Sequence, residues 1–209
     1  NWKIKYACER WAYTFLSLYF FIFLHILSVR TGLAIAYAGI LILVVFYLHK
    51  LSLWKKLALV VLVLAAPFVA YKTIRGFEQK INYTIWDFGK FIRGEGNTYS
   101  DSERWESWKA GIDIGKKHFL FGTGTGHFRP ELQDYYKNVL HKEEWTRPHN
   151  QFINVFACFG ITGLLIFLFI LVYPMTFKQF WQVPLIPTLY LMQILSMMVE
   201  HPLDTQVGA

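Results

Sequence analysis

Residues 147–173 read RPHNQFINVFACFGITGLLIFLFILVY, a short polar head that leads directly into a long apolar segment. A membrane-spanning helix needs about 17–25 mostly apolar residues, and the segment from Phe152 to Tyr173 meets that requirement. A soluble helix of the same composition would have no partner for its outward face. The stretch therefore predicts a transmembrane helix with a histidine, His149, at its mouth.

The same apolar character recurs along the chain. Hydrophobic residues make up 55% of the sequence and charged residues 17%, against about 45–50% and about 25% in typical soluble domains. The excess is concentrated in five runs, which span residues 11–28, 32–48, 53–70, 152–173 and 183–199. The last run is the weakest, because Pro184 and Pro187 crowd its start, although proline is tolerated in the first turn of a helix.

We therefore expect an all-α polytopic membrane protein with about five transmembrane helices. Three would lie in residues 1–70 and two in residues 149–209, which end in a short outer tail. Residues 71–148 would form one large loop domain that contains helices. The odd number of spans and the abrupt ends of the chain suggest a piece of a longer protein.

Lysine and arginine in the short connections predict the orientation, because cytoplasmic loops carry an excess of them. These residues precede the first run or lie between the second and third or the fourth and fifth runs: Lys3, Lys5, Arg10, Lys50, Lys55, Lys56 and Lys178. The loop over residues 71–148 then lies on the outer side, since long loops cross largely regardless of their charge. The net charge of +7 reflects this topology, and we expect no nucleic-acid partner.

The first part of the loop, residues 71–99, shows no sustained hydrophobic period. We expect irregular backbone there, with one short helix on the membrane surface around residues 85–92. A further loop helix is expected over residues 128–144, where apolar residues recur on one side.

A clear helix start lies in the middle of the loop. Ser100 and Glu103 have the spacing of a capping box, in which each side chain accepts from a backbone donor of the first turn. Trp105, Trp108 and Ile112 then recur at helical spacing and predict an aromatic stripe on one face.

Residues 119–126, FLFGTGTG, contain three alternate glycines. They resemble a phosphate-binding loop only superficially, because no strand precedes them, no helix start follows them, and the lysine of such a loop is absent. We instead expect a tight backbone turn that lets the loop pack against the membrane domain.

Three cationic or titratable residues fall on the predicted outer side: Arg30, Arg104 and His149. Each alone has an ordinary explanation, as a snorkelling arginine, a solvated surface arginine and an interfacial histidine. Together they suit phosphate chemistry, since arginine binds phosphate oxygens bidentately and histidine accepts a proton near neutral pH. His25, inside the first span, is expected to make an interhelical hydrogen bond rather than to act in catalysis.

Four short motifs, in this order, resemble the C-terminal half of the O-antigen ligase and O-antigen polymerase family of bacterial inner membranes. They are SVRTG at 28–32, SDSERWESWK at 100–109, HFLFGTG at 118–124 and PHNQF at 148–152. The resemblance extends from about Phe15 to the end of the chain, and family members have roughly twice as many spans.

The resemblance implies a periplasmic active site in which an undecaprenyl diphosphate-linked glycan is transferred to an acceptor hydroxyl of lipid A-core. Arg30 and Arg104 match the family's two phosphate-facing arginines, and His149 matches its catalytic histidine. The family acid near the outer end of a late span corresponds to Glu200 or to Asp204. No metal and no cofactor is implied.

Other functions fit the same motifs. An O-antigen polymerase and a protein O-oligosaccharyltransferase would differ only in the acceptor, a glycan or a protein in place of a glycolipid. A non-catalytic membrane scaffold, whose loop binds a partner, is the alternative from another class. Transport is disfavoured, because the spans are nearly free of charge and transporters carry polar or broken spans at mid-membrane.

Overall fold

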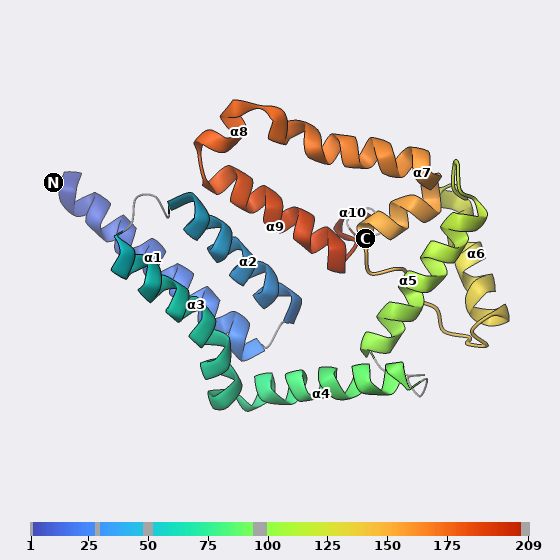
Figure 1. Ribbon diagram of the computed structural model, residues 1–209, viewed down its shortest axis with the longest axis horizontal. Helices are drawn as coiled ribbons and strands as arrows, with labels where there is room; N and C mark the ends of the chain where they lie inside the picture. The colour runs from blue at the N-terminus through green and yellow to red at the C-terminus, as the bar shows by residue number, and fades with distance from the viewer. Residues whose placement is uncertain (1, 28–29, 48–51, 94–99, 206–209) are drawn as a thin grey trace. The chain divides into compact units, whose positions relative to one another are not determined.

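The computed structural model describes residues 2–27, 30–47, 52–93 and 100–205 (Figure 1). Within these ranges every regular element is a helix. The chain divides into two compact units, Asn1–Ile85 and Trp86–Ala209. The all-helical fold class predicted from the sequence is therefore confirmed.

The first unit contains α1 (Trp2–Leu27), α2 (Arg30–Tyr47) and α3 (Leu53–Thr73), together with the start of α4 (Arg75–Ile92). His25 is only 6% exposed and joins α1 to α2, because its Nε2 lies 2.8 Å from the Tyr37 hydroxyl. The interhelical hydrogen bond expected of His25 is confirmed.

Among the described residues, three helices are long and apolar enough to cross a membrane: Cys8–Leu27, Arg30–Tyr47 and Gln151–Thr176. The third and fifth expected spans coincide with helices α3 and α9 (Leu185–Val199). At 1.5 Å per residue, α9 is roughly 22 Å long, shorter than the roughly 30 Å of a bilayer core. The membrane location is supported, and the count of five spans stays a prediction.

The irregular backbone predicted for residues 71–99 is wrong where the structure describes it. Helix α4 covers Arg75–Ile92, and α3 extends to Thr73. The apolar residues of this stretch recur three or four positions apart, which is the period of an amphipathic helix; they are Ile74, Phe77, Ile81, Ile85, Phe88 and Ile92.

The second loop helix also differs from the prediction. Helix α6 spans Thr125–Asn138 instead of residues 128–144, so a helix does start within the alternate-glycine segment, with Gly124 as its N-cap. Val139 is the C-cap of α6. Two residues later, His141 has a positive φ of 54°, a backbone conformation that is not compatible with a continuing α-helix. The chain then runs without regular structure to Asn150.

The core of the second unit forms where α5 (Ser100–Lys117) packs on α7 (Gln151–Val172) and α6. Small residues allow this close approach: a Cβ added at Gly111 would lie 2.7 Å from the Pro148 ring and 2.6 Å from Ile153. The packing face of α5 is therefore the one that carries Gly111, whereas Trp105 remains 43% exposed. The side chains of Ser100 and Asp101, where the capping box was expected, lie outside the described residues.

Helix α7 is broken at Gly160, whose φ of 65° and ψ of −165° are not helical. Figure 1 shows its first section beside α5 and its second section running antiparallel to α9. His149 therefore precedes a short helical section that packs on the loop helix, and not the start of one straight span.

The alternate-glycine segment fills the break in α7. The Thr123 and Gly124 amides donate to the carbonyls of Ala157 and Cys158 at 3.0 and 2.8 Å. In the other direction, the Ile161 amide donates to the Phe119 carbonyl at 2.7 Å. Unpaired backbone groups are costly away from water, so this pairing stabilises the break. The expected tight turn is present and packs against α7.

We predict that Gly160→Ala destabilises the protein. A Cβ at this position would lie 2.5 Å from the Leu120 carbonyl group, in addition to the positive φ. Backbone strain of this kind alone costs about 1–3 kcal/mol. The effect is measured as the melting temperature of the detergent-purified protein, with thermal unfolding monitored by size-exclusion chromatography. Gly126→Ala is the matched control, because nothing lies within 4 Å of its added Cβ; equal melting temperatures for the two variants would contradict the role of the break.

Candidate functional site

Three segments that are distant in the sequence meet at His149. Helix α5 contributes Arg104 and Trp108, the irregular segment before α7 contributes His149 itself, and the C-terminal end of α9 contributes Glu200. All of them belong to the second unit.

Local sequence fixes the backbone around His149. Pro148 is fully buried, and the Trp108 indole donates to the His149 carbonyl at 3.1 Å. Asn150 caps α7, because its side-chain oxygen accepts from the Phe152 and Ile153 amides at 3.0 and 3.1 Å. The backbone position of His149 is thus fixed by the buried Pro148 before it and by the helix-capping Asn150 after it.

The same cap ties the start of α7 to the end of α9. The Asn150 side-chain amide donates to the Met198 carbonyl at 2.8 Å. The Gln151 amide donates to the Glu200 carbonyl at 3.2 Å, and the Gln151 side chain accepts from the Leu203 amide at 3.1 Å. These bonds hold Glu200 beside His149.

The Glu200 carboxylate bridges two of the predicted site residues. One oxygen accepts from the Arg104 guanidinium at 2.8 Å, and the other lies 3.0 Å from Nδ1 of His149. The side chain of Arg104 is 31% exposed, that of His149 is 30% exposed and that of Glu200 is 39% exposed. The group is therefore partly shielded but open to a substrate.

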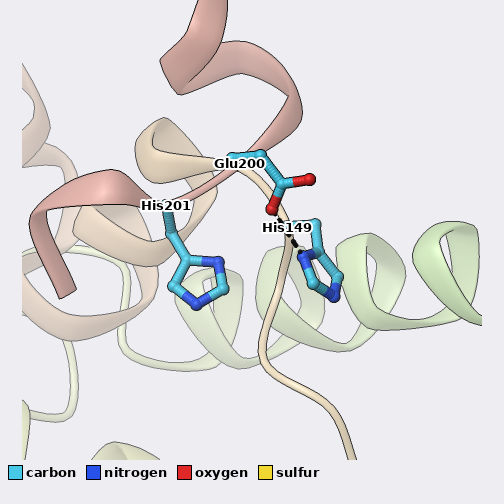
Figure 2. Close-up of side chains that lie close together, drawn as sticks. All are labelled: His149, Glu200 and His201. Carbon is cyan, nitrogen blue, oxygen red and sulfur yellow. Dashed lines mark hydrogen bonds and ion pairs between the residues drawn. The ribbon is translucent and has the colours of Figure 1, made fainter. Parts of the chain in front are cut away.

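His201 completes the cluster, with its ring centroid 5.3 Å from that of His149 (Figure 2). His201 was not among the site residues predicted from the sequence. The available signal was its place directly after Glu200, in an ionisable pair that follows an apolar run.

A metal ion is one chemical possibility for this cluster, because His149, Glu200 and His201 each offer one ligand atom within 4.8 Å of the others. The contacts around Glu200 favour a hydrogen-bonded group instead. One of its oxygens already accepts from Arg104 and the other faces Nδ1 of His149. A divalent cation bound through the oxygen that faces His149 would compete with the Nδ1 contact and lie near a guanidinium charge.

The structure brings together three of the four predicted site residues: Arg104, His149 and Glu200. Arg30 belongs to the first unit, where its guanidinium donates to the Thr84 hydroxyl. Ser28 and Val29, which open its motif, lie outside the described residues, as does the side chain of Asp204, the alternative acid. The roles of all these residues stay predictions.

A family model described as O-antigen ligase matches residues 15–168 of the chain. The match includes Arg30, Arg104 and His149, whereas Glu200 and His201 lie beyond its end. Comparisons with curated proteins and with solved structures gave no match.

We predict that Asn150→Ala lowers thermal stability, because it removes both the helix cap and the bond to Met198. Loss of a cap costs about 1 kcal/mol, and loss of a further hydrogen bond costs about the same again. Asn150→Ser is the control that restores the cap acceptor but cannot reach Met198. Its melting temperature should fall between those of the Ala variant and the parent, and a parental melting temperature for the Ala variant would contradict the assignment.

Proposed function

This chain belongs to the O-antigen ligase family, and from that premise we propose that it transfers a glycan from undecaprenyl diphosphate to an acceptor hydroxyl. The family consists of membrane glycosyltransferases of the ligase type, and the apolar helices of this chain suit a membrane location. The proposed acceptor is lipid A-core, and the proposed location is the periplasmic side of the bacterial inner membrane.

One observation supports this proposal most directly: the contact between Glu200 and Nδ1 of His149 at 3.0 Å. A carboxylate accepts a hydrogen bond, so Nδ1 carries the ring proton and Nε2 presents its lone pair. An acid that orients a histidine in this way is the arrangement of a general base in nucleophilic catalysis. We assign Glu200 as a positioning residue and His149 as the base.

The reaction then proceeds as a direct displacement. Nε2 of His149 removes the proton of the acceptor hydroxyl while its oxygen forms a bond to the anomeric carbon of the donor sugar. The bond between that carbon and the diphosphate oxygen breaks, and its electron pair leaves with the diphosphate. The proton remains on His149 until it is released to solvent.

Arginine contributes at the leaving group, where negative charge accumulates. A guanidinium presents five donors in a planar fork that matches phosphate oxygens. Arg104 uses one terminal nitrogen on Glu200, so this contact orients the rest of the fork next to His149. We propose the same role for Arg30 on the strength of its motif.

We predict that His149→Ala lowers glycan transfer about 10²–10⁴-fold, the usual contribution of general-base assistance. Transfer is measured in vitro with the full-length protein and a lipid-linked donor, and membrane insertion is checked in parallel. His127, exposed on α6, provides the control: His127→Ala should transfer at the parental rate. His149→Gln keeps hydrogen bonding but cannot accept the proton, so near-parental turnover by this variant would rule out proton abstraction.

Arg104→Lys should lose most activity although it retains the charge, because lysine is a point donor and cannot hold phosphate bidentately. The decisive measurement is the donor dependence of the transfer rate. Arg75→Lys, at an exposed position that starts α4, is the matched control and should behave like the parent. A parental rate for Arg104→Lys would show that the fork has no such role.

A further inference from the structure

A cleft of about 390 Å³ lies in the second unit beside the candidate site. Its walls come from α5, from α6 and from the irregular segment that leads to His149. The lining residues are Glu103, Glu106, Tyr136, Lys142, Glu143, Glu144, Trp145 and Thr146.

Thr146 connects the cleft to the proposed base. Its hydroxyl oxygen lies 3.5 Å from Nε2 of His149, and Thr146 is itself part of the cleft wall. Since Glu200 occupies the Nδ1 side of the ring, the nitrogen that is left for chemistry is the one on the cleft side. A hydroxyl bound at this end of the cleft would lie next to the base.

The charge of the cleft argues against the diphosphate as its occupant. Four carboxylates and one ammonium line it, which gives a net charge of 1 − 4 = −3. Lys142 is paired with Glu106 at 2.6 Å, so its charge is already compensated. A phosphate or a sugar acid would be repelled here, whereas the Arg104 side, where the guanidinium is paired with Glu200, carries no such excess of negative charge. The two substrates therefore have separate electrostatic environments.

The remaining lining groups suit an uncharged sugar. Carboxylates accept hydrogen bonds from hydroxyl groups. Trp145, over whose ring the Arg129 guanidinium lies 5.2 Å from the centroid, supplies apolar surface for the carbon skeleton. Tyr136 is 3% exposed, and its hydroxyl has no hydrogen-bond partner of normal geometry in the part of the chain that the structure describes. Burial and the nearby Glu106 raise the pKa of this phenol to about 12, against a smaller effect of the Thr146 backbone. The group keeps its proton and can donate it.

We propose that this cleft is the acceptor subsite and that its carboxylates select an uncharged, hydroxyl-rich sugar over an anionic one at the accepting end. The proposal rests on the transfer reaction proposed above, because it places the acceptor hydroxyl at Nε2 of His149. Binding in the cleft, however, does not require that reaction, so the two can be tested apart.

The test measures binding directly, by saturation-transfer NMR on the full chain in nanodiscs. The probes are a neutral glucose tetrasaccharide and the same tetrasaccharide with a terminal glucuronic acid. The neutral probe should bind the parent about tenfold more tightly, as expected for a net repulsion of a few charges near a protein surface. Equal affinities of the two probes, or no binding of the neutral one, would overturn the proposal.

A double variant, Glu143→Gln together with Glu144→Gln, tests whether the carboxylates cause the selection. Both residues are exposed, so the fold should tolerate the change, and the net charge of the lining falls from −3 to −1. The preference for the neutral probe should then shrink to about two- to threefold. Asp134→Asn, exposed on α6 and outside the cleft, should keep the parental preference; a full preference in the double variant would overturn the proposal.

His149→Ala separates this proposal from the catalytic one. The variant should lose transfer but still bind the neutral probe, because His149 does not line the cleft. If His149→Ala transfers normally while the Glu143 and Glu144 variant loses its preference, the catalytic assignment fails and the acceptor cleft stands. If transfer is lost as expected but the charge variants leave selection unchanged, only the cleft proposal fails.

Discussion

A single carboxylate, that of Glu200, determines how the second unit is assembled around its candidate site. It accepts from Arg104 on α5 with one oxygen and faces Nδ1 of His149 with the other. Three segments therefore share one ionic contact, and the backbone bonds from Asn150 and Gln151 to the end of α9 keep it in place. Removal of Arg104 or of Glu200 would leave the other, partly shielded charge without its ion-pair partner. The proposed base, its proposed orienting acid and a proposed phosphate-binding side chain are thus positioned together.

The break at Gly160 makes this assembly possible. If α7 continued straight, its first section could not lie against α5 while its second section runs beside α9 (Figure 1). A broken helix exposes backbone donors and acceptors, and the 119–124 segment pairs with them. Both sides of the contact need glycine: Gly122 and Gly160 have φ values of 70° and 65°, and a Cβ on either one would meet the opposite backbone. Glycines that look like a ligand loop are in fact structural.

Electrostatics divide the surroundings of His149 into two sides. Arg104, paired with Glu200, lies on one side, and the carboxylate-lined cleft that ends at Thr146 supplies net negative charge on the other. A reaction between a diphosphate donor and an uncharged acceptor suits such a division, because the acidic cleft repels the diphosphate and does not repel the acceptor. A histidine between the two sides can act on the acceptor without contacting the leaving group.

The sequence by itself determined the helical class, the apolar helices and most of the candidate residues, because these depend on local composition and short motifs. It predicted only the last part of α4, as a short helix around residues 85–92, although the apolar period runs through the whole helix. It extended α6 too far because nothing local predicts the positive φ of His141. Only the tertiary structure decided that α7 breaks, that Glu200 faces His149, and that His201 and an acidic cleft lie beside them. The physical reason is separation along the chain: Glu200 lies 51 residues from His149 and 96 from Arg104. Contacts over such distances depend on a turn and a kink that packing stabilises, and not on any pattern within one helix.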